Sequence, residues 1–163
     1  KAKGLPVGKS LVGDTSDKSL AELLAAPQLH IPIDVRAQEF AAGITPSPAA
    51  AISKSVSDVK GADVILDIGP KSSEELATLV HNAKTVLWNG PLGNYENGFI
   101  EATDDLARAI AASHSHSIIG GGDTIAAIEK LGLFSKFSFV STGGGAMLDF
   151  LAYGTLPGIE ALS

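Results

Sequence analysis

The chain of 163 residues contains no cysteine, which excludes disulfide bonds and thiolate metal sites. The absence of cysteine is compatible with a reducing compartment, and we expect a cytoplasmic protein. Lysine and arginine number 12 against 18 acidic residues, the net charge is −6 and no basic cluster occurs, so we expect no nucleic-acid partner. No apolar run approaches the roughly 18–20 residues that a membrane span requires, and we expect no membrane partner.

Several familiar motifs are also absent. The sequence has no Walker A loop and no Gly-x-Gly-x-x-Gly fingerprint, and no nucleophile stands beside a base. His114 and His116 are two residues apart, as in a metal pair at a strand edge, but no third ligand is evident. We therefore interpret this pair as part of a solvated loop.

The most informative feature present is a set of glycine-rich turns, each following a short apolar run. The turns are 89–93 after 85–88, 120–124 after 117–119, and 141–146 after 137–140. A strand that ends in glycines and then enters a helix directs free backbone N–H groups and the positive end of the helix dipole at one point. On one parallel sheet, three such ends would lie along the same edge. The pattern predicts a surface that binds phosphate groups.

Beyond residue 63, apolar strands alternate with amphipathic helices. Val64–Ile68 is a continuous apolar run that we predict to be the first strand of this series, and Ser72 with Glu75 predicts a capping box on the following helix. A later helix is expected to be capped near Thr103. Strands that are apolar on both faces and alternate with helices predict an α/β fold, a Rossmann-like parallel sheet with helices on both faces.

The first 62 residues are less regular. We expect a helix from about Asp17 to Ala25 and a short strand over His30–Val35, with Pro32 at its beginning or on a sheet edge. Residues 36–62 are rich in Ala, Ser and Pro and are predicted to be a surface excursion with minor edge strands. The whole of residues 1–163 is expected to form a single domain.

Four polar residues near the turns are candidates for ligand binding. Asp123 is either a helix cap or a Mg²⁺ ligand, and Thr124 either donates to a phosphate or supports the cap. Glu96 is a candidate for ribose hydroxyls or a solvated loop residue, and Asn89 is a candidate phosphate contact or a turn-forming residue.

Taken together, these motifs closely resemble the nucleotide-binding C-terminal domain of the phosphoglycerate kinase family. The matching segments, in the family's order, are Val7-Gly8-Lys9-Ser10-Leu11, Ile31-Pro32-Ile33-Asp34-Val35, Leu66-Asp67-Ile68-Gly69-Pro70, Val86-Leu87-Trp88-Asn89-Gly90-Pro91-Leu92-Gly93, Ile118 to Thr124, Ser141 to Ala146 and Leu156-Pro157-Gly158. The Trp-Asn-Gly-Pro and Gly-Gly-Gly-Asp-Thr blocks are the most specific of these.

The resemblance implies a role for each matching residue. Asp123 would hold Mg²⁺, Glu96 would bind the ribose, and Leu66 and Pro91 would line the adenine pocket. The full set implied to bind ATP or ADP is Leu66, Asn89, Gly90, Pro91, Glu96, Gly121, Gly122, Asp123 and Thr124. The helix N-terminus at Gly143, Gly144 and Gly145 would face the transferred phosphoryl group, a catalytic role.

The family transfers phosphate between ATP and the carboxylate of 3-phosphoglycerate, giving 1,3-bisphosphoglycerate, as two domains close on each other. The resemblance also implies that the N-terminal phosphoglycerate-binding domain and the opening strands of the C-terminal domain are absent here, because the chain begins at Lys1 inside the family pattern. By this resemblance, residues 1–163 form a single, incomplete nucleotide-binding domain. The fragment is therefore expected to be inactive alone, and the full-length protein a monomer. The alternatives are a non-catalytic nucleotide-binding fragment and another sugar or lipid kinase with a Gly-Gly-Asp loop. Asn94 departs from the apolar residue usual in the family, and Tyr95 from a common Phe.

Overall fold

The computed structural model describes residues 1–13 and 18–162. The expected start of the first helix, Asp17, lies outside the described residues. The helices and strands are α1 (Lys18–Ala25), β1 (Asp34–Glu39), β2 (Ile52–Ser55), η1 (Val56–Asp58), β3 (Asp63–Ile68), α2 (Pro70–Asn82), β4 (Thr85–Asn89), η2 (Tyr95–Asn97), α3 (Glu101–Ala112), β5 (His116–Gly120), α4 (Gly122–Lys130), η3 (Phe134–Lys136), β6 (Phe139–Ser141), α5 (Gly144–Tyr153) and α6 (Pro157–Glu160).

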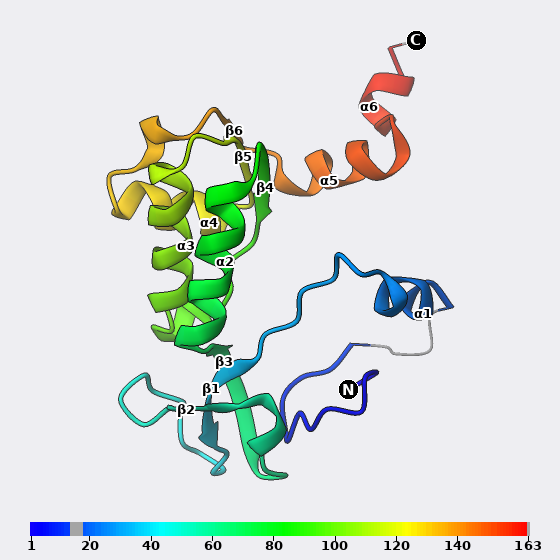
Figure 1. Cartoon of the computed structure of the whole chain (residues 1–163). Coiled ribbons are helices and arrows are strands. Elements are labelled where there is room, and N and C mark those ends of the chain that lie inside the picture. The colour runs from blue at the N-terminus through cyan, green and yellow to red at the C-terminus, as the bar shows by residue number, and fades with distance from the viewer. Residues whose placement is uncertain (14–17, 163) are drawn as a thin grey trace.

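The second half of the chain forms the predicted α/β unit. Strands β4, β5 and β6 make a parallel sheet in that order, and helices α2, α3 and α4 pack together on one side of it (Figure 1). The core beneath these helices contains Trp88, Ile119 and Ile128, of which both isoleucines are fully buried. Burying a side chain of this size stabilises the fold by about 1.5–3 kcal/mol. The predicted parallel sheet flanked by helices is confirmed.

Strand β3 does not belong to this parallel sheet, contrary to the prediction. It pairs antiparallel with β1 in a second sheet of order β2-β1-β3. The apolar run of β3 predicted a strand correctly, but hydrophobicity alone does not identify the strand that pairs with it. The backbone of β3 forms its ladder hydrogen bonds with β1, which extends to Glu39, whereas the expected strand in this region ended at Val35.

Strand β1 is also shifted and more central than expected. It begins at Asp34, after Pro32, and continues to Glu39 as the middle strand of its sheet. From Val35 to Gln38, the buried Val35 and Ala37 alternate with the partly buried Arg36 and Gln38, which is a period of two. Because Arg36 and Gln38 are polar and the alternating stretch is short, the sequence pattern did not identify it as a strand. Residues 36–62 therefore provide four of the six residues of β1 and all of β2. β2 is an edge strand, as expected, whereas β1 is the central strand of the sheet.

A buried carboxylate connects this antiparallel sheet to the parallel unit. Asp34 of β1 accepts hydrogen bonds from the backbone N–H groups of Lys71 (3.1 Å) and Ser72 (2.8 Å) in the first turn of α2. The Ser72 hydroxyl donates to the same carboxylate at 2.7 Å. The predicted capping box of Ser72 and Glu75 is therefore wrong, because the helix N-terminus is satisfied by a distant residue and Gly69 is the N-cap.

The predicted cap at Thr103 is wrong for a similar reason. Helix α3 begins two residues earlier, at Glu101, and Thr103 is fully buried within it. Its hydroxyl oxygen accepts a hydrogen bond from the backbone N–H of Leu92 at 3.0 Å. Thr103 thus holds the loop after β4 against α3.

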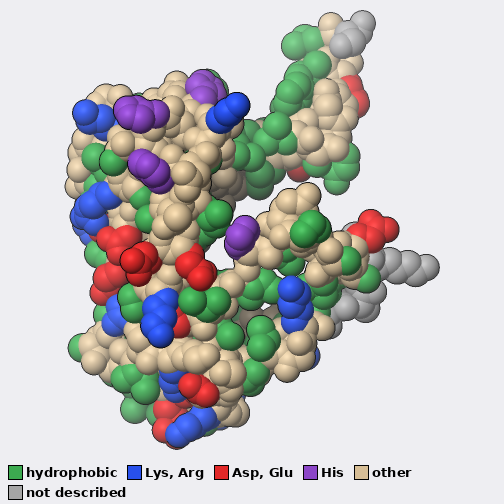
Figure 2. Space-filling view, in the orientation of Figure 1, with side chains coloured by type: hydrophobic (Ala, Val, Ile, Leu, Met, Phe, Trp, Pro, Cys, Tyr) green, Lys and Arg blue, Asp and Glu red, His purple; other side chains and the backbone are tan. Residues whose placement is uncertain are grey.

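At the C-terminal end, α5 and α6 extend away from the parallel sheet (Figure 1). Figure 2 shows apolar side chains along this extension, and Leu151 (59%), Tyr153 (78%) and Leu162 (90%) are strongly exposed. Within residues 1–13 and 18–162, no helix combines the length and the hydropathy that crossing a membrane requires.

Candidate functional site

The three glycine-rich turns meet at one edge of the parallel sheet, as the sequence predicted. In the strand register, Asn89 of β4 lies beside Gly120 of β5, and Gly120 lies beside Ser141 of β6. The carboxyl ends of the strands are therefore level with one another. Each turn leaves the sheet at the same height, next to the N-termini of α4 and α5.

The side chain of Asn89 lies at the centre of these turns. A Cβ atom added to Gly120, Gly121 or Gly144 would lie 2.8, 3.0 or 2.8 Å from Asn89 Oδ1. This oxygen is inaccessible to solvent and accepts no hydrogen bond from the described residues. An unpaired buried acceptor costs about 1–3 kcal/mol, and the glycines allow the backbone of the second and third turns to approach it closely. Asn89 is therefore more than a local turn residue.

Thr124 joins the first turn to the second. It is fully buried in the first turn of α4, and its hydroxyl oxygen accepts a hydrogen bond from the Gly90 N–H at 2.9 Å. The Gly90 carbonyl in turn accepts a hydrogen bond from Trp88 Nε1 at 2.8 Å. The structure thus gives Thr124 a role in packing the turns, and its side chain has no exposed surface.

Asp123 is free at the same edge. It is the second residue of α4, it is exposed, and the N-cap is Gly121 with no side-chain hydrogen bond, so the interpretation of Asp123 as a helix cap is wrong. A negative charge in the first turn of a helix is favoured by the dipole. Mg²⁺ commonly takes one or two protein carboxylates and completes its shell with water and substrate phosphates. One free carboxylate beside exposed backbone N–H groups fits that donor set.

The turn glycines fall into two groups by their surroundings. Gly121 and Gly144 contact each other, and Gly121 has a φ of +91°, which favours glycine. Gly122 and Gly145 are exposed, with no atom within 4 Å of an added Cβ, and Gly143 has only the Ala146 methyl nearby. The first group packs the turns together, and the second leaves backbone accessible to a ligand.

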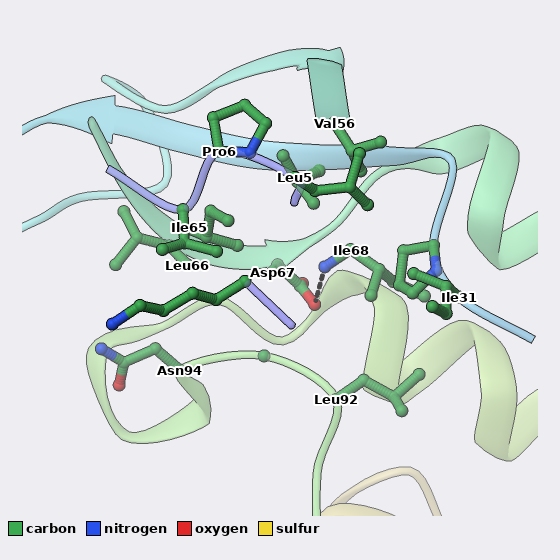
Figure 3. Close-up of a pocket in the computed structure, with 15 residues that line it drawn as sticks. Leu5, Pro6, Ile31, Val56, Ile65, Leu66, Asp67, Ile68, Leu92 and Asn94 are labelled. Atoms are coloured by element: carbon green, nitrogen blue, oxygen red, sulfur yellow. Dashed lines mark hydrogen bonds between the residues drawn. The ribbon is translucent and has the colours of Figure 1, made fainter. Parts of the chain in front are cut away.

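A mainly apolar pocket of about 410 Å³ lies beside the loop that follows β4 (Figure 3). Figure 3 shows Leu66 of β3 lining it together with Leu92 and Asn94, and Gly93 also belongs to the lining. The first turn and this pocket are therefore built from one continuous segment, residues 89–94. Leu66 is half of the expected adenine wall; Pro91, the other half, is not among the lining residues. Glu96 lies nearby in η2 and is exposed.

Sequence reasoning missed Asp67, which lines the same pocket and is 3% exposed. Its carboxylate accepts a hydrogen bond from the Ile68 N–H at 2.9 Å, and the Ala102 N–H at the start of α3 lies 3.5 Å from its other oxygen. Burial raises its pKa to about 6, against the effect of these hydrogen bonds. Gly93 packs directly on this carboxylate. The sequence signal that could have identified it is the single charged residue, Asp67, within the otherwise apolar run Val64–Ile68.

The two histidines lie at the start of β5. His114 precedes the strand and His116 is its first residue, so the expectation that both belong to a loop is wrong for His116, although both side chains are exposed. The described part of the chain contains no group of three or more His, Asp or Glu side chains placed to hold a metal ion.

The fold and the site define a class of protein in which parallel β-strands end in glycine-rich turns, a class that binds ligands at the carboxyl edge of the sheet. The sequence model described as phosphoglycerate kinase matches residues 1–153. The chain therefore belongs to the phosphoglycerate kinase family.

Individual relatives agree with this assignment. The phosphoglycerate kinases of Francisella tularensis subsp. novicida and subsp. tularensis are 46% and 47% identical over 99% of this chain. The solved phosphoglycerate kinase of Coxiella burnetii is 36% identical, covers 98% of this chain and superposes with a TM-score of 0.80. That of Pyrococcus horikoshii is 31% identical over 80% of the chain, with a TM-score of 0.65.

The chain is much shorter than these relatives. It spans 42% of the length of the Francisella proteins, 41% of the Coxiella chain and 31% of the Pyrococcus chain.

Proposed function

We propose that this chain carries the Mg-nucleotide half-site of a phosphoglycerate kinase, the enzyme that transfers a phosphoryl group reversibly between ATP and 3-phosphoglycerate in glycolysis. The observation that carries the proposal is the convergence of three glycine-rich turns around Asn89, level with one another in the strand register. Free N–H groups at the N-termini of α4 and α5 suit the phosphates of ADP or ATP. A cytoplasmic location, with no nucleic-acid partner, is part of the same proposal.

Each turn has its own role in this proposal. Gly121 packs the second turn against the first and third turns, Gly122 binds phosphate through its accessible backbone, and Asp123 holds Mg²⁺ against that phosphate. Gly143, Gly144 and Gly145 lie at the N-terminus of α5, which faces the transferred phosphoryl group. Magnesium, when bound, would neutralise charge on the phosphate oxygens.

The base and ribose are assigned to the neighbouring pocket. Leu66 supplies an apolar wall for adenine, with Pro91 at its margin, and Glu96 accepts from the ribose hydroxyls. The supporting observation is that residues 89–94 form both the first turn and one side of this pocket. A nucleotide that spans the two would contact one continuous segment of chain.

The isolated chain is proposed to bind nucleotide without turnover. Phosphoryl transfer is catalysed mainly by positioning and by neutralising charge, and the three turns contain no lysine or arginine. The second substrate, 3-phosphoglycerate or 1,3-bisphosphoglycerate, is assigned to the part of the family's length that this chain does not span. That arrangement favours the second candidate, a non-catalytic nucleotide-binding fragment, for the chain by itself.

Calorimetric titration with Mg·ADP tests the half-site. We expect saturable binding that requires Mg²⁺ and that weakens at least about tenfold in Asp123→Ala, since a charged contact contributes about 1.5–3 kcal/mol. Glu129→Ala is the matched control, because Glu129 is exposed on the same helix near its other end. Equal affinity of the two variants would overturn the role of Asp123.

A coupled assay tests the absence of turnover. With Mg·ATP and 3-phosphoglycerate, the chain alone is expected to give no rate above buffer. Turnover that disappears in Asp123→Ala would show that these 163 residues contain the whole catalytic apparatus, and would refute the proposal of an inactive half-site.

A further inference from the structure

The pocket beside residues 89–94 is apolar except for three side chains. Lys1, Asp67 and Asn94 are polar, and every other residue that lines the pocket is apolar or glycine. A small-molecule pocket of this kind takes its specificity from the few polar groups placed in it. The hydrogen-bonding capacity of these three side chains therefore decides which chemical groups a bound ring can present to the pocket.

The carboxylate of Asp67 is not available to a ligand. Asp67 is 3% exposed, and its oxygens accept hydrogen bonds from the backbone N–H groups of Ile68 at 2.9 Å and Ala102 at 3.5 Å. Gly93 packs directly on the same carboxylate. The acidic side chain of the lining is therefore engaged with its own backbone surroundings and offers no free acceptor.

The amide of Asn94 is held so that its nitrogen is free. The Asn94 backbone N–H donates to the Leu66 carbonyl at 2.8 Å, and Asn94 Oδ1 accepts a hydrogen bond from Asn97 Nδ2 at 2.9 Å. Among the described residues, none accepts a hydrogen bond from Asn94 Nδ2, and Asn94 is exposed. Figure 3 shows this side chain at the rim of the pocket, with its nitrogen on the side of Leu66 and its oxygen on the opposite side.

The free polar groups of the lining are thus donors. An asparagine Nδ2 carries two donors and a lysine ammonium carries three, and neither nitrogen accepts a hydrogen bond. Lys1 is exposed, on a flexible four-carbon stem. Asn94 is the fixed donor, because one hydrogen bond anchors its backbone to β3 and another orients its amide.

Purine bases differ in what they present to a donor. Adenine has an acceptor at N7 and an amino donor at C6, whereas a 6-oxopurine has acceptors at both N7 and O6. An amino group facing Asn94 Nδ2 would place two donors against each other, and an oxo group would accept from it. We propose that Asn94 makes this pocket select a 6-oxopurine nucleotide, such as GDP or IDP, over ADP. This inference rests on the proposed function, in which the pocket holds the base.

Calorimetric titration of the unmodified chain with Mg·ADP and Mg·IDP tests the selectivity. The two nucleotides share the ribose and the phosphates, and at C6 one carries an amino group and the other an oxo group. We expect IDP to bind about fivefold more tightly, the equivalent of one hydrogen bond. GDP, which shares the 6-oxo group, should also bind more tightly than ADP. Equal affinities, or tighter binding of ADP than of IDP and GDP, would overturn the inference.

Two variants test whether Asn94 is the source of the selectivity. Asn94→Leu keeps the branched shape without the amide, and we expect the ratio of the two affinities to fall to within about twofold of one. Asn97→Ala removes the bond that orients the amide, so the ratio should fall although Asn94 is retained. Selectivity that survives Asn94→Leu would overturn the inference, and selectivity that survives Asn97→Ala would overturn the orientation on which it depends.

Asn82→Leu is the matched control. Asn82 is exposed at the last position of α2 and does not line the pocket, so this variant should keep the selectivity of the unmodified chain. The ratio of affinities is measured within each variant, and a general loss of binding therefore cancels. Loss of selectivity in Asn82→Leu as large as in Asn94→Leu would show that the effect is not specific to the pocket, and the inference would be wrong.

The outcomes separate this inference from the proposed function. Failure of the unmodified chain to bind Mg·ADP, Mg·IDP and Mg·GDP would overturn the proposed function, and the inference with it. Binding that weakens in Asp123→Ala but does not distinguish ADP from IDP would leave the proposed function standing and overturn the inference alone. Asp123→Ala should weaken both nucleotides equally, because its proposed contact through Mg²⁺ is with the phosphates that they share.

Discussion

Gly144 and Gly145 are consecutive residues at the start of α5 with opposite surroundings, and alanine at each position tests how the turns pack. A Cβ on Gly144 would collide with the Gly121 N atom and would lie 2.8 Å from both Gly121 Cα and Asn89 Oδ1. A Cβ on Gly145 would have no atom within 4 Å. Both positions are exchanged for the same residue in the same helical turn, so helix propensity acts similarly on each.

The expected difference follows from the clash alone. Inserting a methyl group into a filled space costs about 1–3 kcal/mol, and two of the three obstructing atoms, Gly121 N and Cα, belong to backbone that cannot rotate away. Alanine in place of glycine in a helix contributes about 0.5–1 kcal/mol of stability, which applies to both variants and largely cancels. In a chain of this size, 1 kcal/mol shifts the melting temperature by roughly 2–4 °C. Gly144→Ala should therefore melt roughly 2–12 °C below Gly145→Ala.

Thermal unfolding followed by Trp88 fluorescence measures this difference at the turns. Trp88 is the only tryptophan, is 6% exposed and donates a hydrogen bond to the Gly90 carbonyl. Far-UV circular dichroism measures the helices independently. If Gly144→Ala melts at or above the temperature of Gly145→Ala in both measurements, the close packing of the second and third turns is wrong.

Three further predictions concern stability and association. Because burial raises the pKa of Asp67 to about 6, its contribution to stability is present below pH ~4 and lost as the pH rises through 6. Asp67→Asn should reduce the pH dependence of the free energy of urea unfolding between about pH 4 and 6. A pH dependence equal to that of the unmodified chain would contradict this prediction. Burial raises the pKa of Asp34, but hydrogen bonds from Ser72 and Lys71 outweigh it, so the pKa is lowered overall. The contribution of Asp34 to the free energy of unfolding is therefore lost as the pH falls below about 4. Asp34→Ala should cost about 1.5–3 kcal/mol at pH 7 in urea unfolding, and a loss that persists undiminished at low pH would refute the assignment. The exposed apolar face around Leu151 should cause concentration-dependent self-association that Leu151→Glu reduces, measured by light scattering; a monomer at every concentration would exclude it.

Local sequence patterns predicted the parallel half of the fold because each element there carries its own signal. The apolar runs before the three turns became β4, β5 and β6. The position of Asn89 and Asp123 at strand and helix ends followed from the same patterns. These features depend on neighbours within a few residues, which a sequence displays directly.

The errors concern contacts between distant segments. Ser72 has the spacing of a capping box, yet a carboxylate 38 positions away in sequence binds it instead. Strand β3 has the composition of a parallel-sheet strand, yet it pairs with β1. Local propensity is a weak predictor where a tertiary partner offers a better hydrogen bond.

The sequence by itself determined that this chain is an α/β protein of the phosphoglycerate kinase type, with glycine-rich turns at the ends of three strands, because strand, turn and helix patterns are local. Only the tertiary structure decided how those turns meet: Asn89 at their centre, Thr124 turned inward, Asp123 left free. It also decided that Asp34 and Asp67 are buried carboxylates beside the N-termini of α2 and α3. The physical reason is that burial, pKa and hydrogen-bond partners depend on which distant segments lie within a few ångströms, and that distance is set by the packing of the whole chain.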